Sequence, residues 1–106
     1  MLKGEYKMKV ITVCGSYKYK NEMQEITEKM ALKGNCMLTP IELTKHNKEA
    51  YTKEECLTLG KMHKDKIKLS DAILVVNVDG YIGDSTKSEI EYAKKCRKAF
   101  LERSGE

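Results

Sequence analysis

The stretch AILVVNV, Ala72–Val78, is the most apolar run of the chain and predicts a central buried strand. A continuous apolar run, without the alternation of a half-exposed strand, is typical of a parallel strand that helices cover on both faces. We therefore expect a parallel sheet, whose other strands must come from elsewhere in the chain because parallel neighbours need long crossover connections.

Three shorter apolar runs predict further strands. Val10–Val13 is rich in β-branched residues and stops at Gly15 and Ser16. Cys36–Pro40 closes with the only proline, and Lys98–Leu101 is long enough for a short last strand. We expect a sheet of about five strands, of which these three runs and the central strand account for four.

Three segments carry helical spacing or helix caps. Apolar residues recur at helical spacing across Asn21–Lys33, which ends at a Gly-Asn stop signal. Thr52 and Glu55 have the form of a capping box and open a helix that runs to Ser70. A third helix is expected at about Thr86–Cys96 from its cap and apolar spacing.

Strands and helices alternate along the chain, which predicts parallel strands joined by right-handed crossovers. The expected fold is a doubly wound α/β sheet of the flavodoxin or Rossmann type, a single domain over residues 1–106 with helices on both faces. In such sheets, ligands bind beyond the carboxyl ends of the strands, where the strand order reverses. CGSYK at 14–18 and NVDGYIGDSTKSE at 77–89 should meet at that edge, with Glu89 among them. The polar segment Glu42–Tyr51, which contains His46, is expected to be a mobile loop of the kind that covers ligands.

Charge and composition narrow the classes of partner. The net charge is +4, and the chain has no basic block with interleaved aromatic residues, so we expect no nucleic-acid partner. No apolar run of about 18 residues and no secretory signal pattern are present, which argues against a membrane span and against secretion. A small phosphorylated ligand and a cytoplasmic setting suit this composition best.

The cysteines and histidines show no metal-binding pattern. The cysteines are scattered, without a C-x-x-C pair, at Cys14, Cys36, Cys56 and Cys96. The sequence therefore indicates neither a disulfide framework nor a zinc site, and no cofactor is expected. Cys14 is expected to pack in the core as a free thiol, and His63 is expected to be a partly exposed surface residue.

The segment after the first strand, CGSYKYKN at 14–21, has two readings. Gly15 permits close backbone approach, Ser16 offers a hydroxyl, and Lys18 or Lys20 could hold a phosphate at the following helix N-terminus. The alternative is a plain turn with a helix cap, which is the commoner role of Gly-Ser after a strand. Neither a dinucleotide-binding fingerprint nor a Walker P-loop is present.

The segment TKSE, Thr86–Glu89, also has two readings. It fits a capping box, in which the Thr86 side chain bonds the backbone of Glu89 and the Glu89 side chain reaches back. Alternatively, the Glu89 carboxylate faces a ligand held at the edge of the sheet. The segment taken by itself favours the cap.

A pattern that extends over more of the chain favours the second reading, in which the Glu89 carboxylate faces a ligand. CGS after a strand, HKDKIKLSDAILVVN at 63–77 and GDSTKSEIEYA at 83–93 together resemble the nucleoside 2-deoxyribosyltransferase superfamily, which includes the 2′-deoxynucleoside 5′-phosphate N-hydrolases. In that family a Glu-(Leu/Ile)-Gly-x-Ala motif carries the catalytic Glu, and Glu89 to Ala93 matches it with Glu91 in place of the Gly. An upstream Asp before an apolar strand matches Asp65. The resemblance covers nearly the whole domain.

The resemblance implies cleavage or transfer of an N-glycosidic bond in a nucleoside or nucleoside 5′-monophosphate, and a homodimer. Glu89 would be the nucleophile or would stabilise an oxocarbenium-like state. Asp65, or else Asp84, would protonate the leaving base. The remaining expected contacts to phosphate or sugar are Gly15, Ser16, Lys18, Ser85 and Ser88.

Two other classes of function stay open at the level of sequence. One is a binding or sensing module that keeps the nucleotide pocket of this fold but has lost turnover, because a fold does not guarantee an activity. The other is a small interaction or scaffold protein, which would display a large exposed apolar patch.

Overall fold

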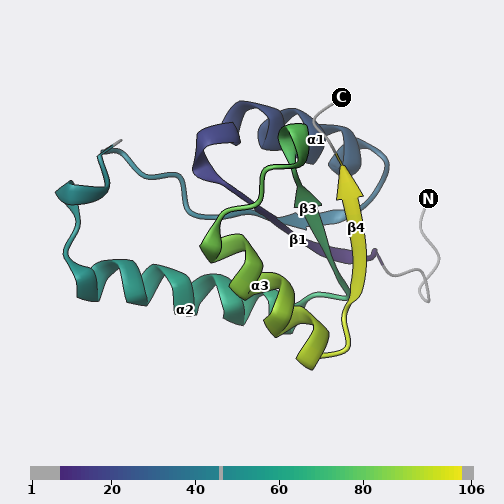
Figure 1. Ribbon diagram of the computed structural model, residues 1–106. Coiled ribbons are helices and arrows are strands. Elements are labelled where there is room, and N and C mark those ends of the chain that lie inside the picture. The colour runs from purple at the N-terminus through teal and green to yellow at the C-terminus, as the bar shows by residue number, and fades with distance from the viewer. Residues whose placement is uncertain (1–7, 46, 104–106) are drawn as a thin grey trace.

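The computed structural model describes residues 8–45 and 47–103 and contains a parallel sheet with helices on both faces (Figure 1). The main elements are β1 Val10–Gly15, α1 Lys20–Leu32, β2 Cys36–Leu38, α2 Lys53–Leu69, β3 Ala72–Val76, α3 Asp84–Lys95 and β4 Ala99–Arg103. Three short 3-10 helices lie in the connections: η1 Tyr17–Tyr19, η2 Lys48–Ala50 and η3 Val78–Gly80.

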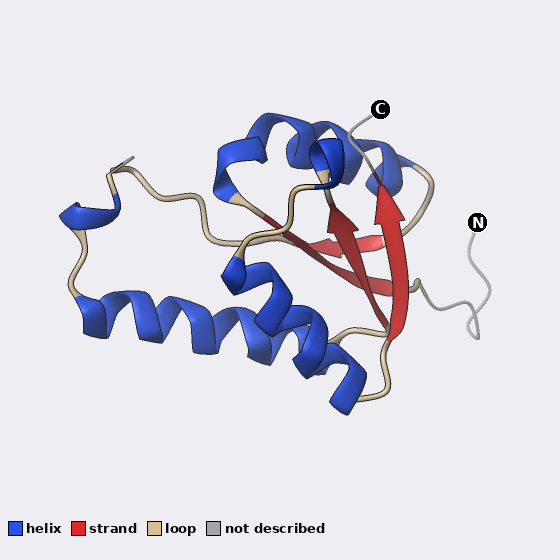
Figure 2. Ribbon diagram, viewed as in Figure 1, coloured by secondary structure: helices blue, strands red, loops and turns tan. Residues whose placement is uncertain are grey.

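The strand order is β2-β1-β3-β4 and every pair is parallel, which confirms the doubly wound α/β prediction. The described residues form four strands where about five were expected. Figure 2 shows the strands side by side with helices above and below them. The chain leaves β1 toward β2 and later enters β3 on the other side of β1, so the order reverses between β1 and β3.

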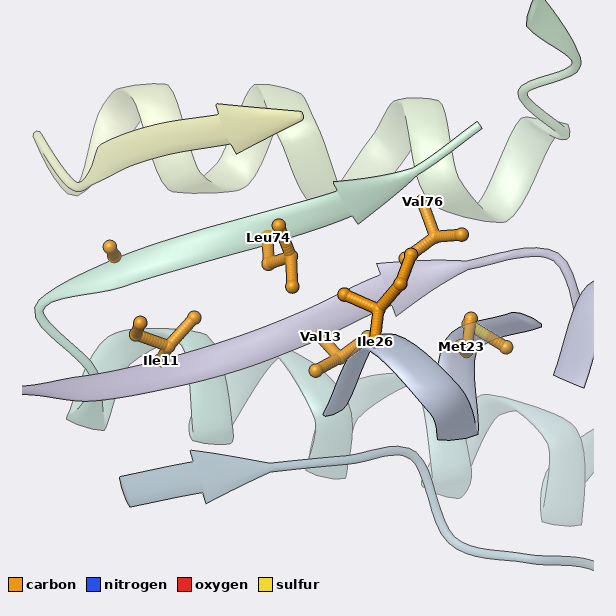
Figure 3. Packing of buried hydrophobic residues seen from close by; sticks show 7 residues of the cluster. Ile11, Val13, Met23, Ile26, Leu74 and Val76 are labelled. Atoms are coloured by element: carbon orange, nitrogen blue, oxygen red, sulfur yellow. The ribbon is translucent and has the colours of Figure 1, made fainter. Parts of the chain in front are cut away.

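One face of the sheet packs against α1 through a cluster of buried apolar side chains. Figure 3 shows these side chains interdigitating between the strands and the helix. The cluster consists of Ile11, Val13, Met23, Ile26, Ala72, Leu74 and Val76. Alternation along β1 and β3 places these strand residues on one side and their neighbours in sequence on the other.

The opposite face packs against α2 and α3 and contains polar groups as well. Its apolar cluster consists of Cys14, Ile67, Ile73, Val75 and Ala93. Thr12 also points to this face, and its hydroxyl donates to the carbonyl of Lys66 in α2 over 3.0 Å. This second face is the one that borders the functional groups described below.

The first residues of α2 and α3 can be compared with the capping boxes considered from the sequence. Thr52 and Glu55 form the expected capping box at the start of α2. The α3 helix, however, begins at Asp84 after an extended Gly83, with no side-chain cap. Thr86 therefore lies inside the helix and is buried, so the capping-box alternative for Thr86–Glu89 is wrong. The Glu89 carboxylate is left available for other contacts.

The connection from β2 to α2 extends away from the sheet. Figure 1 shows this connection looping outward and the first turns of α2 projecting beyond the strands. Within this connection, the Tyr51 hydroxyl accepts a hydrogen bond from the backbone N–H of Lys45. His46 lies outside the described residues. Among the helices that the structure describes, none has the length and apolar character needed to span a membrane.

Candidate functional site

A cavity of about 430 Å³ opens at the carboxyl end of β1, bounded by the β2–α2 connection, α2 and the start of α3. Its size is within the range of small-molecule sites, and it lies near the reversal of strand order, where ligands bind in this class of sheet. Most of the wall is apolar or aromatic: Tyr17, Pro40, Ile41, Leu43, Tyr51, Leu59 and Met62. The polar and charged part of the wall includes Lys45, His63, Lys66, Ser85 and Glu89.

Glu89 is held in this wall by the helical repeat of α3. It shares the sheet-facing side of the helix with Thr86 and Ala93, which are both buried, so its side chain is only 14% exposed. Burial raises the pKa of Glu89 to about 7, while a hydrogen bond from the Cys14 thiol and the charge of Lys64 act in the opposite direction. Burial therefore favours the protonated form of this carboxyl group far more than in an exposed glutamate.

His63 contacts the Glu89 carboxylate from α2. Its Nε2 lies 3.8 Å from Glu89 Oε1, and its side chain is 8% exposed. Burial, and next the charge of Lys66, lower the pKa of His63 to about 4; the backbone of Val13 offsets this only in part. The ring is therefore neutral at pH 7, and its contact with Glu89 is not an ion pair under those conditions. No described residue makes a well-formed hydrogen bond to Nδ1, the other ring nitrogen, which is buried.

Cys14 completes a compact group at the end of β1. Its Sγ lies 3.7 Å from His63 Nε2, and burial together with the Glu89 carboxylate raises the pKa of the thiol. The donor atoms of Cys14, His63 and Glu89 all lie within 4.8 Å of one another. We refer to these three residues as the Cys14–His63–Glu89 cluster.

The structure places part of the predicted site in the cavity wall. Ser85 and Glu89 line the cavity together because residues four positions apart lie on the same side of a helix. Asp84 and Ser88 are each rotated away from that side; both are exposed and lie outside the described cavity wall. Glu89 is the only carboxylate among the described residues that line the cavity.

The predicted phosphate group after β1 is not gathered at the cavity. Gly15 lines it, but a Cβ at this position would lie 2.7 Å from Met23 Sδ, so tight packing against α1 explains the glycine. The Ser16 hydroxyl accepts from the backbone N–H of Lys18 and caps η1, as the turn-and-cap reading expected. Lys18 Nζ lies 4.7 Å from the ring centre of Tyr81, a cation–π contact between the loops after β1 and β3.

Asp65 does not reach the cavity. Its side chain is 58% exposed and pairs with Lys61 one turn earlier in α2. Two positions along a helix turn the side-chain direction by about 200°, so Asp65 points away from the side that carries His63. The general-acid role expected for Asp65 therefore has no support in its position.

His63 was expected at the surface, and that expectation is wrong, because its residue is only 6% exposed. Its position is explained by the buried stripe of α2, in which His63, Ile67 and Ser70 follow helical spacing. That spacing is visible in the sequence and is the signal that locates His63 inside.

Comparison of the chain with models of known protein families finds no match, and comparison with curated proteins finds none either.

Proposed function

We propose that this protein cleaves or transfers the N-glycosidic bond of a nucleoside or nucleoside 5′-monophosphate, as a member of the nucleoside 2-deoxyribosyltransferase superfamily. The observation that carries the proposal is the Glu89 carboxylate, buried in the wall of a largely apolar cavity near the reversal of strand order. A carboxylate in such a place is suited to meet positive charge that develops on a sugar ring.

The proposed chemistry takes place in two steps at the anomeric carbon. A Glu89 oxygen bonds to C1′ while the C1′–N bond breaks and its electron pair leaves with the base. The departing base takes up a proton from solvent. In hydrolysis, water then attacks C1′, loses a proton to solvent and releases the carboxylate; in transfer, the nitrogen of a second base attacks C1′ and loses its proton in the same way. In this scheme Cys14 and His63 are positioning residues that hold the carboxylate toward the cavity.

The cavity wall also suits the two ends of such a substrate. Tyr51, Leu59 and Met62 offer flat and apolar surface of the kind that binds a nucleobase. Lys45 and Lys66 supply positive charge for a 5′-phosphate. We therefore assign the phosphate to this pair rather than to Ser16 and Lys18.

The decisive experiment measures release of free base by chromatography from a panel of ribo- and deoxyribonucleosides and their 5′-monophosphates. Glu89→Gln keeps the shape of the side chain but cannot act as a nucleophile, so base release should fall by about a thousandfold or more. Glu91→Gln makes the same charge change at an exposed position on the same helix and serves as the matched control. Full activity in Glu89→Gln would overturn the proposal.

A second candidate function is nucleotide binding without turnover. It is favoured by the position of Asp65 outside the cavity, which leaves Glu89 without a second carboxyl group among the described lining residues. In that case a 5′-monophosphate should raise the melting temperature of the wild-type protein, by mass action, while no substrate in the panel yields free base.

A further inference from the structure

The Cys14–His63–Glu89 cluster brings together three different donor atoms at one point beside the cavity. A thiol sulfur, an imidazole nitrogen and a carboxylate oxygen approach one another from β1, α2 and α3 respectively. The sulfur–nitrogen distance is 3.7 Å and the nitrogen–oxygen distance is 3.8 Å. Cys14 and His63 are both buried, the Cys14 thiol makes its hydrogen bonds within the cluster, and Nδ1 of the ring makes no well-formed hydrogen bond to a described residue.

These distances match the spacing of ligands around a tetrahedral metal ion. Zinc binds sulfur at about 2.3 Å, imidazole nitrogen at about 2.0–2.1 Å and carboxylate oxygen at about 2.0–2.2 Å. Tetrahedral angles then place neighbouring donor atoms about 3.3–3.6 Å apart. The sulfur–nitrogen and nitrogen–oxygen distances exceed this range by a few tenths of an ångström, and the sulfur lies within 4.8 Å of a carboxylate oxygen. One ion therefore fits between the three side chains after a small contraction.

We propose that the Cys14–His63–Glu89 cluster binds one divalent transition-metal ion of the zinc type, with a fourth coordination position open to the cavity. The mixed sulfur, nitrogen and oxygen donors select zinc-like ions over Mg²⁺ and Ca²⁺, which prefer oxygen ligands alone. His63 and Glu89 line the cavity whereas Cys14 lies behind them, so the remaining position points toward the cavity.

Metal binding needs defined proton states in the cluster. Cys14 gives up its thiol proton to solvent and binds as thiolate, and Glu89 binds as carboxylate. His63 binds through Nε2 as the neutral ring, with its proton on Nδ1. Three protein ligands and one open position are the arrangement found in catalytic rather than purely structural zinc sites.

A bound ion would also occupy the carboxylate that the proposed reaction uses. If the proposed function holds, this metal inhibits base release, because a carboxylate that donates electron density to the ion is a weaker nucleophile toward C1′. The metal site itself does not depend on that activity.

The test is a titration of the reduced, untagged protein with Co²⁺, followed by absorption spectroscopy. The proposal expects a thiolate-to-cobalt charge-transfer band in the near ultraviolet and intense visible bands of a tetrahedral site, saturating at one equivalent and lost on addition of Zn²⁺. Cys14→Ser should lose the thiolate band. The matched control Cys36→Ser, at an exposed position in β2, should keep it.

Absence of the thiolate band in the wild-type protein would overturn the inference without any substitution that affects folding. Persistence of the band in Cys14→Ser would also overturn it, since the sulfur ligand would then be another cysteine. Base release measured in the presence of a chelator separates the two proposals. Activity without a cobalt band refutes only the metal site, and a cobalt band without activity refutes only the glycosidic reaction.

Discussion

The two faces of the sheet differ in what they bury. The buried cluster of the α1 face consists of aliphatic side chains and Met23, with Met30 and Met37 packed against it. The α2 and α3 face holds the buried polar residues of the described chain, Thr12, His63, Ser70 and Thr86, in addition to Cys14 and most of Glu89. Both faces bury an apolar cluster, but the second face also carries the groups that can do chemistry.

The cost of burying polar groups is not spread evenly over the second face. Burying a polar group is costly unless it is hydrogen-bonded, and the hydroxyls of Thr12 and Ser70 both donate to backbone carbonyls of α2. Cys14, His63 and Glu89 are the exceptions, because burial shifts the pKa of each away from its ordinary value. The unfavourable desolvation is concentrated at the cavity, which is typical of functional sites.

The largest effect is expected on the α1 face. Leu74 in β3 is fully buried, so Leu74→Ala should lower the free energy of unfolding by about 2–5 kcal/mol. Leu101, its register partner in β4, is 39% exposed, and Leu101→Ala should cost about 1 kcal/mol or less. Urea denaturation measures both. Equal losses would show that β4 is buried in solution and that the α1 face extends further than described.

An effect of intermediate size is expected when pH is varied, because Glu89 and His63 on the α2 and α3 face change the pH dependence of the free energy of unfolding. The Glu89 pKa rises from 4.5 to about 7, so its contribution to the free energy of unfolding falls as pH increases across that interval. The His63 pKa falls from 6.5 to about 4, so its contribution rises as pH increases from 4 to 6.5. The two contributions oppose each other, and stability should change little between about pH 4.5 and 6.5.

Single substitutions should separate the contributions of Glu89 and His63 to the pH dependence of the free energy of unfolding. In Glu89→Gln, stability should rise by up to about 3 kcal/mol from pH 4 to 6.5, because His63 acts alone. In His63→Asn, it should fall by a similar amount from pH 4.5 to 7. Urea midpoints across this pH range measure both, and Leu74→Ala should keep the flat wild-type profile. Wild-type-like profiles in both cavity variants would contradict the assignment of these groups.

The smallest effect is expected at Asp65. Its pair with Lys61 is exposed, and such pairs contribute about 0–1 kcal/mol, so Asp65→Ala should change the free energy of unfolding by less than about 1 kcal/mol. Base release should be unchanged, because Asp65 lies outside the cavity wall. A loss comparable to that of Glu89→Gln would return Asp65 to the reaction and contradict the position found here.

The fold followed from the sequence because each strand is a distinct local run. Ala72–Val76 and Val10–Gly15 lie where the apolar runs predicted them, and the alternation of strands and helices was enough to give parallel topology. Helix boundaries were less certain. A Thr-x-x-Glu pattern at Thr86 is shared by caps and by helix interiors, and only the extended Gly83 decides where α3 begins.

The site was predictable only in part because its members meet through packing. Glu89 was predicted from a motif, but the side of α2 that faces it had to be known before Asp65 could be placed outside the cavity and His63 inside it. Cys14 and His63 lie 49 positions apart, so no local spacing between cysteine and histidine reveals their contact.

The pairing of β1 with β3 has a consequence for how fast the chain folds. Val10 donates its backbone N–H to the Asp71 carboxylate across 61 positions, and every strand pair is parallel, so no two strands form a local hairpin. The β1–β3 pair can form only after a long stretch of chain has closed into a loop. Loop closure lowers the entropy of the chain, and contacts between residues close in sequence do not offset this loss. Folding should therefore be limited by the meeting of β1 and β3, with the α1 and α2 crossovers already helical, and should be slow for a chain of 106 residues.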